Sequence, residues 1–165
     1  MRLDDEPRIA VSTLVDATTD DLWPIVTDIA LPPRWSTELD SAEWIDEGPA
    51  VGARFVGRNR LGDRSWEVVC TVVELDPSRR FTWSVGDPEA PAATWGYEVE
   101  DAEGGVELRH WCRIGLGRSG LRRAVEAHPD DEEAIVRFRL DDLQSNMQTV
   151  VEGMRALAER APGVG

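Results

Sequence analysis

The chain has 165 residues, 41% of them hydrophobic, and its 32 acidic against 18 basic residues give a formal net charge of −14. This length suits a single domain over residues 1–165, with loose tails expected at about 1–7 and 161–165, and the negative charge disfavours binding to nucleic acid or to anionic membrane surfaces. No apolar run approaches the roughly 20 residues that span a bilayer, and the charged N-terminus lacks the apolar stretch of a signal peptide, so we expect a cytoplasmic protein without membrane insertion.

The first part of the chain is expected to form a strand and two short helices. Residues 8–16 alternate loosely between apolar and polar positions, which is typical of a strand. Thr18 and Asp21 have the spacing of a helix capping pair, so a helix is expected through about residue 28. Leu31–Trp35 begins a second helical piece, because its two prolines can start a helix but not continue it.

The middle of the chain is a series of strand-like segments. Apolar and polar residues alternate in each segment, and short turns rich in Gly, Pro and Asp separate them. Such short connections favour antiparallel hairpins. The expected strands cover residues 41–47, 53–60, 65–75, 80–85, 91–100 and 106–114.

The last third of the chain is expected to be helical. Residues 119–127 form a short amphipathic piece, which His128 and Pro129 interrupt. A long amphipathic helix then follows, because apolar residues recur at steps of three and four and make one stripe. The stripe consists of Val136, Leu140, Leu143, Met147, Val150, Val151, Met154 and Leu157.

The tryptophans are the most informative residues of the chain. Seven occur, and Trp66, Trp83 and Trp95 each lie on the apolar alternating face of a predicted strand. Successive strand residues point to opposite faces, so the pattern predicts one sheet face rich in large rings. A curved sheet closing over one helix leaves either a packed core or an aromatic-lined cavity. Trp111 falls on the opposite face with Arg109 and Arg113. The stems of these arginines are expected to cover it, with a homodimer contact as the alternative.

The chain lacks the usual signatures of cofactor and metal enzymes. No glycine-rich nucleotide motif, zinc-protease motif, CxxC pair or nucleophile elbow occurs, and every basic residue is arginine. Lysine Schiff-base chemistry is therefore excluded. Cys70 and Cys112 lie on apolar strand faces and are expected to be buried free thiols. We expect no cofactor and no metal.

Several short segments, in this order, carry a family resemblance. They are Val11–Val15 leading to Leu22 and Trp23, Asp28, Pro33–Trp35, Gly48, Gly52–Phe55, Val73–Pro77, Arg80–Trp83, Trp95–Tyr97 and Asn146–Glu159. Over residues 8–160 the chain resembles the START/Bet v 1-like (SRPBCC) superfamily, most closely its bacterial polyketide cyclase/dehydrase and lipid-transport branch.

The resemblance implies an α+β helix-grip fold. Its features are an antiparallel curved sheet of about seven strands, two short helices after the first strand, and a long C-terminal helix that the sheet wraps around. The resemblance also implies a deep cavity between sheet and helix. It implies no particular reaction, and no catalytic motif carries over to this sequence.

Three polar residues are candidates for contacts inside such a cavity. His110 lies on the inward face of its strand and could move a proton or orient a ligand carbonyl, although a core histidine with a satisfied partner is the favoured alternative. Tyr97 could act as a general acid or a hydrogen-bond donor, or be a core tyrosine. Asn59 shares a face with Phe55, although a solvated strand end is the favoured alternative. His110 and Tyr97 are the catalytic candidates.

Other candidates supply rings and one charge. Trp66, Trp83 and Trp95 either stack on a planar ligand or pack the core. The family's architecture places Trp35 near the cavity mouth. Arg139 and Asn146 flank the apolar stripe and could meet an anionic or carbonyl group, with solvent exposure as the favoured alternative. The expected ligand-binding set is Trp35, Phe55, Asn59, Trp66, Trp83, Trp95, Tyr97, His110, Arg139 and Met147.

These patterns support three hypotheses of function. The first is a non-catalytic binder of a small hydrophobic, aromatic or polyketide/lipid-like molecule. The second is a cofactor-free polyketide aromatase/cyclase or dehydratase that uses the same cavity. The third is a protein-interaction module with a packed interior. A protein that needs no cavity has little reason to place Trp, Tyr, His and Asn on one inner face, which favours the first two.

Overall fold

The computed structural model describes residues 1–160, and the expected tail at 161–165 lies outside them. Its strands are β1 (Arg8–Val15), β2 (Leu39–Trp44), β3 (Arg54–Leu61), β4 (Arg64–Asp76), β5 (Arg80–Val85), β6 (Ala93–Ala102) and β7 (Gly105–Ile114). Its α-helices are α1 (Thr19–Val26), α2 (Gly120–Ala127) and α3 (Glu132–Arg160). Single 3-10 turns occur at η1 (Leu3–Asp5), η2 (Pro32–Arg34) and η3 (Pro129–Asp131).

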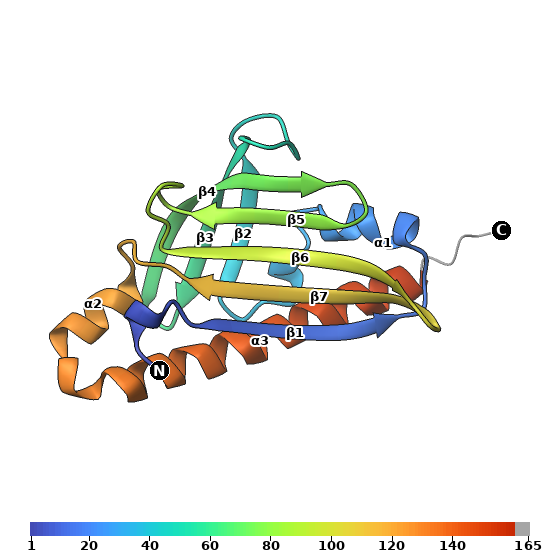
Figure 1. The fold of residues 1–165 in the computed structure, drawn as a ribbon. Coiled ribbons are helices and arrows are strands. Elements are labelled where there is room, and N and C mark those ends of the chain that lie inside the picture. Colours follow the sequence, from blue (N-terminus) through green and yellow to red (C-terminus); the bar gives the residue numbers. More distant parts are fainter. Residues whose placement is uncertain (161–165) are drawn as a thin grey trace.

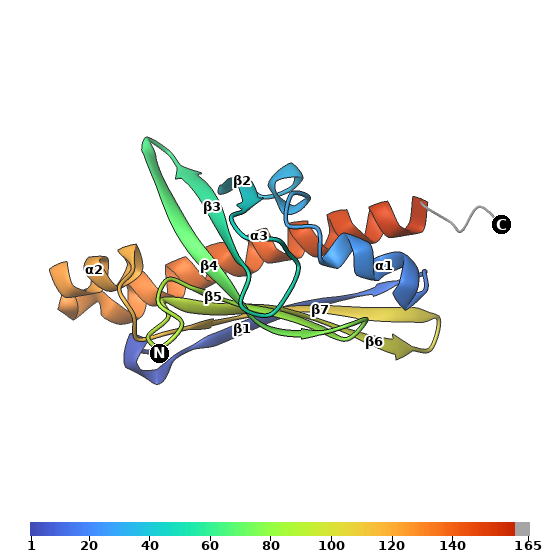
Figure 2. The same ribbon diagram turned by 90° about the horizontal axis from the view of Figure 1, so that it is seen from above.

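The strands form one antiparallel sheet in the order β1-β7-β6-β5-β4-β3-β2. The sheet is strongly curved, and helix α3 runs along its concave side (Figures 1 and 2). The predicted α+β helix-grip fold is therefore confirmed, including the two short helical pieces α1 and η2 after the first strand. Helix α1 begins where expected, because the Thr18 hydroxyl accepts a hydrogen bond from the Asp21 amide at 3.1 Å.

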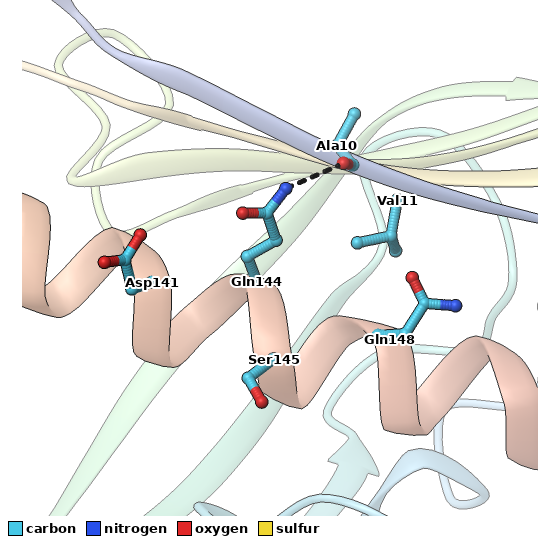
Figure 3. Close-up of a pocket in the computed structure, with 6 residues that line it drawn as sticks. All are labelled: Ala10, Val11, Asp141, Gln144, Ser145 and Gln148. Carbon is cyan, nitrogen blue, oxygen red and sulfur yellow. Dashed lines mark hydrogen bonds between the residues drawn. The ribbon is translucent and has the colours of Figure 1, made fainter.

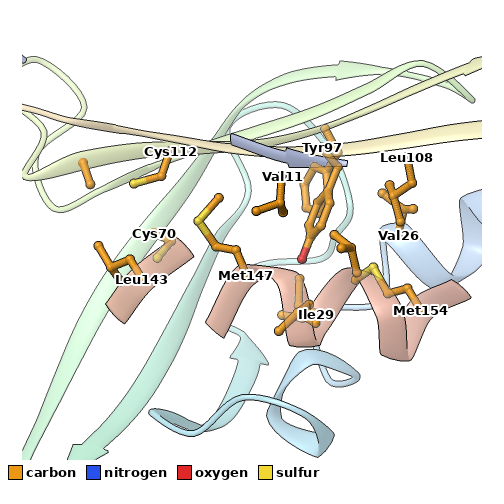
Figure 4. Packing of buried hydrophobic residues seen from close by; sticks show 14 of the residues in the cluster. Val11, Val26, Ile29, Cys70, Tyr97, Leu108, Cys112, Leu143, Met147 and Met154 are labelled. Carbon is orange, nitrogen blue, oxygen red and sulfur yellow. The ribbon is translucent and has the colours of Figure 1, made fainter. Parts of the chain in front are cut away.

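Helix α3 supplies the apolar side of the core. Every residue of the predicted stripe except Leu157 is buried, and Leu157 is partly buried against the same cluster. Figure 4 shows Leu143, Met147 and Met154 of the helix facing Tyr97, Leu108 and Cys112 of the sheet. The burial of this stripe removes apolar surface of both layers from water and holds the helix in the curve of the sheet.

The N-terminal segment is packed, so the expectation of a loose tail at residues 1–7 is wrong. Leu3 is 2% exposed and belongs to the core. Its backbone amide donates to Oε1 of Glu132 at 3.0 Å, and Arg2 forms an ion pair with Oε2 of the same carboxylate at 2.8 Å. The charge pattern of this segment suggested solvent exposure, but a carboxylate at the start of α3 fixes it.

The sheet register brings the predicted inward residues into rows. Tyr97 lies opposite His110, and Trp95 lies opposite both Trp83 and Cys112. Rings of neighbouring strands therefore meet directly, as alternation along each strand predicts. The predicted concave aromatic face exists, and Cys70 and Cys112 on it are buried free thiols as expected.

The concave face has a filled half and a more open half. Towards α1, the side chains of Phe81 and Leu108 are fully covered, and Tyr97, between the two halves, is 3% exposed. Towards α2, Trp83 and Trp95 remain partly exposed although they lie on central strands. Helix α1 packs against α3 and β6 and covers the first half only.

The segment 32–39, here called the strap, connects the β2 edge of the sheet to α3. Trp35 lies against Gly153, so close that a Cβ on Gly153 would overlap the indole ring. Asn146 accepts a hydrogen bond from the Thr37 amide at 2.9 Å, and Arg139 forms an ion pair with Glu38. The three helix positions are seven residues apart, which is nearly two turns, so they share one face of α3.

We expect Gly153→Ala to destabilise the fold although alanine is the better helix former. The helix preference favours Ala by about 1 kcal/mol, but the new Cβ would overlap the Trp35 ring, and such overpacking typically costs about 1–3 kcal/mol. Chemical denaturation should show a net loss of about 1 kcal/mol. Gly120→Ala is the matched control, because its Cβ would meet only the flexible end of Arg64 at 3.3 Å. Equal effects of both changes would contradict the packing of Trp35 on Gly153.

Candidate functional site

A continuous cluster of rings covers the concave face, with Trp83 at its centre. The Trp83 ring centroid lies 5.6 Å from that of Tyr97 and 6.2 Å from that of His110. Trp95 joins the cluster through His110 at 5.5 Å. Phe81 of the same strand lies 5.2 Å from Trp83 between ring centroids. Towards the β2 edge, Phe55 lies 6.1 Å from Trp83, and Trp44 lies 5.3 Å from Phe55.

Tyr97 and His110 form a stacked pair inside this cluster. Their ring centroids are 4.1 Å apart and the ring planes differ by 11°. Antiparallel pairing of β6 with β7 places the two residues directly opposite each other, which brings the rings into contact. Figure 4 shows the Tyr97 side chain pointing from the sheet towards α3.

The protonation state of His110 follows from its surroundings. Nδ1 lies 2.9 Å from the Gly96 carbonyl oxygen, which can only accept, so Nδ1 carries the proton and Nε2 is left as an acceptor. Burial lowers the pKa of His110 to about 4, against a smaller opposing effect of the Gly96 hydrogen bond. Burial also raises the pKa of the Tyr97 hydroxyl well above its usual range. At neutral pH the pair is therefore an uncharged donor beside an uncharged acceptor.

Asn59 and Trp66 lie together, but away from the Tyr97–His110 pair. Both line a surface pocket of about 280 Å³ near the end of the β3–β4 hairpin. Arg64 lies over the Trp66 ring at 5.7 Å from its centroid. The other lining residues, Asp40, Arg58, Ser65 and Glu67, are polar or charged. The lining of this hairpin site is therefore more polar than the concave face.

A larger groove of about 430 Å³ lies outside the sheet edge, between β1 and α3 (Figure 3). Ala10, Val11, Asp141, Gln144, Ser145 and Gln148 line it. The Gln144 side-chain amide donates to the Ala10 carbonyl at 3.3 Å and so binds the free edge of β1 to the helix. None of the residues predicted to bind ligand lines this groove.

The remaining candidates contact the strap or the core. Trp35 is fixed against Gly153, and Met147 is 1% exposed within the apolar cluster. Arg139 and Asn146 are partly buried and bound to the strap, so the favoured alternative of solvent exposure is wrong for both. Their position beside the stripe was predicted from spacing, but a partner segment about 100 residues away in the sequence was not.

Sequence reasoning missed three residues of this region. Trp44 extends the ring cluster, Glu38 neutralises Arg139, and Gly153 receives Trp35. Gly153 follows Arg139 and Asn146 at intervals of seven, and that regular spacing was a usable signal for a contact face on the helix. Glu38 carried no comparable signal, because a single carboxylate in a loop is common.

The described part of the chain contains no group of three or more His, Cys, Asp or Glu side chains suited to a metal ion. No helix among residues 1–160 is long and apolar enough to cross a membrane. Trp111 lies on the convex face as predicted, with Arg8 at 5.6 Å from its ring centroid. The expected arginine cover is present, but Arg8 of the neighbouring strand β1 provides it.

A protein-family profile matches most of the chain. The family is described as polyketide cyclase / dehydrase and lipid transport, and it matches residues 6–155. Among curated proteins, none matches the chain.

Solved structures with the same architecture are numerous. The Polyketide_cyc-like protein Cgl2372 from Corynebacterium glutamicum is 29% identical, with a TM-score of 0.66, over 99% of this chain and 96% of its own. The di-domain ARO/CYC StfQ from the steffimycin biosynthetic pathway is 16% identical, with a TM-score of 0.71, over 95% of this chain and 52% of its own. Ara h 8.0201 is 11% identical, with a TM-score of 0.63, over 92% of this chain and 97% of its own. The latter two likenesses concern the fold alone.

The lowered pKa of His110 predicts a pH dependence of stability. The unfolded chain takes up a proton near the ordinary pKa of 6.5, whereas the folded chain resists it down to about 4. The contribution of His110 to the free energy of unfolding is therefore complete above pH 6.5, and it is lost as the pH falls towards 4. Between pH 7 and 5 the loss is about 2 kcal/mol. Denaturant titrations of the wild type and His110→Gln should diverge by this amount, while His128→Gln, an exposed control, should follow the wild type.

Proposed function

Because the chain belongs to the polyketide cyclase/dehydrase and lipid-transport family, we propose that it binds a small hydrophobic, aromatic molecule between the sheet and α3. The ligand lies against Trp83 and Trp95 in the half of the concave face that α1 does not cover. The stacked Tyr97–His110 pair supplies the polar contacts that orient it.

One observation carries this proposal: Trp83 and Trp95 stay partly exposed at the centre of the sheet. These two large rings face α3, the only long helix among residues 1–160, and so present apolar surface between sheet and helix. Apolar surface left accessible in a concavity is the usual character of a ligand site. Burial of a planar molecule there removes this surface from water and supplies most of the affinity.

Tyr97 and His110 define which polar groups the ligand carries. The Tyr97 hydroxyl is a donor and Nε2 of His110 an acceptor, and the ring stack holds them side by side. An uncharged carbonyl and hydroxyl next to each other on the ligand, as in phenolic or enolic ketones, satisfy both at once. Because both protein groups are neutral, this contact avoids the free-energy cost of burying a charge.

The stacked pair also supports a second candidate function, a cofactor-free cyclase or dehydratase. In a dehydration, Nε2 of His110 takes the proton from the carbon next to the ketone, the carbon–carbon double bond forms, and the leaving hydroxide takes the Tyr97 proton to become water. A proton then returns from the imidazolium to the phenolate. However, a pKa of about 4 makes His110 a weak base, so we place binding first.

Trp95→Leu should lower the affinity for 2-naphthol about tenfold. Aromatic stacking is worth about 0.5–1.5 kcal/mol beyond area burial, and 1.4 kcal/mol is a factor of ten. Binding is measured by native mass spectrometry and by titration calorimetry. Trp111→Leu on the convex face is the matched control and should leave the affinity within about twofold. A bare native mass for the purified chain, persisting after soaking with aromatic and acyl compounds, would instead favour the protein-interaction role.

The dehydratase function makes a separate prediction for Tyr97→Phe. With 4-hydroxy-4-phenylbutan-2-one as substrate, the variant should form the conjugated ketone roughly a hundredfold more slowly than the wild type, because a general acid typically contributes about that much. Its affinity for 2-naphthol should change much less. Ultraviolet absorbance follows the product. If the wild type shows no rate above buffer, the chain is a binder for this class of compound.

A further inference from the structure

Arg139 is held by two carboxylates at the edge of the open half of the concave face. Its Nη2 lies 2.8 Å from Oε1 and 3.0 Å from Oε2 of Glu38, and only the second contact has hydrogen-bond geometry. Its Nη1 lies 3.2 Å from Oδ2 of Asp142. Among residues 1–160, no donor forms a hydrogen bond to the buried Oε1 of Glu38. The Glu38 carboxylate is therefore withdrawn from water without full compensation by hydrogen bonds, which costs free energy.

The positive charge of Arg139 affects a buried group, the Cys112 thiol. Cys112 of strand β7 is 0% exposed, and burial raises the pKa of its thiol to about 12, a rise that the positive charge of Arg139 opposes. Cys112 lies opposite Trp95 in the sheet register. Leu143, one turn after Arg139 along α3, faces Cys112 of the sheet (Figure 4), so Arg139 lies next to the same row of the concave face that carries the partly exposed indoles.

The Glu38 side chain can leave Arg139 without unfolding the strap. The Glu38 amide donates to the Ser36 hydroxyl at 3.1 Å, and the Glu38 carbonyl accepts from the Arg60 amide at 2.8 Å. Asn146 binds the backbone amide of Thr37 and the hydroxyl of Ser36. None of these contacts involves the Glu38 carboxylate, so the strap backbone has its own attachments to β3 and α3.

We propose that Arg139 binds a carboxylate carried by the aromatic ligand, and that Glu38 occupies this position until the ligand displaces it. This inference rests on the proposed function and specifies the ligand class as aromatic carboxylic acids. With the carboxylate on Arg139, the ring extends over Trp95 and Trp83, towards the donor and acceptor of the Tyr97–His110 pair.

The competition between Glu38 and the ligand gives the test. An internal carboxylate has a high effective concentration, so its removal should raise the affinity for an added carboxylate. We compare 2-naphthoate with the neutral 2-naphthol by titration calorimetry at pH 7. Glu38→Gln keeps the size and a hydrogen-bond acceptor, and it should bind 2-naphthoate about tenfold more tightly than the wild type. Its affinity for 2-naphthol should stay within about twofold.

Arg139→Gln should remove the preference for the acid. Its affinity for 2-naphthoate should fall about tenfold or more from that of Glu38→Gln, with 2-naphthol again little changed. Arg155→Gln and Glu43→Gln are matched controls, because both residues form exposed ion pairs elsewhere. Thermal denaturation confirms that each variant is folded before it is titrated.

The outcomes distinguish a failure of this inference from a failure of the proposed function on which it rests. If the variants change the affinities for 2-naphthoate and 2-naphthol equally, or change neither, the Arg139–Glu38 pair is a structural latch and the inference is wrong, while binding itself stands. If neither compound binds to any folded variant, the proposed function fails, and the assignment of Arg139 fails with it.

Discussion

The fold depends on the burial of one apolar stripe of α3 in the curve of the sheet. Nearly all the buried side chains of the helix belong to that stripe, and the concave face supplies their partners from most of the strands. Because α1 completes this burial at one end only, Trp83 and Trp95 of the sheet stay partly exposed towards α2. The ligand site that we propose is thus a continuation of the core towards α2.

Charge acts on this region locally. A net charge of −14 repels anions, but water and salt largely screen that repulsion beyond about 10 Å. The charge of Arg139, which is partly withdrawn from solvent, is screened less. It can therefore make the local electrostatic potential positive although the whole protein is negative. The chain neutralises this arginine with carboxylates of its own, which prevents an uncompensated cation from lying beside an apolar surface.

The sequence was informative where one segment determines its own structure. Alternation in the strands placed Trp83, Trp95, Tyr97 and His110 on one face, and register then brought the last two together. The helix stripe was equally readable. What sequence reasoning missed depends on contacts between distant segments: the clamp of Glu132 on Leu3, and the strap on α3. Whether the rings leave room for a ligand was undecidable from periodicity, since filled and open faces share the same pattern.

The seven-residue spacing of Arg139, Asn146 and Gly153 also limits how this chain can change its length. The strap runs beside the helix and meets it at three points. Insertion of one residue into α3 between these points would turn everything after it by about 100°. The indole of Trp35 would then face a side chain instead of a bare backbone, while the Glu38 end stayed in place. The spacing of the contact points in the helix must therefore match their spacing in the strap. Insertions that homologues tolerate in this helix should fall before residue 139 or after residue 153.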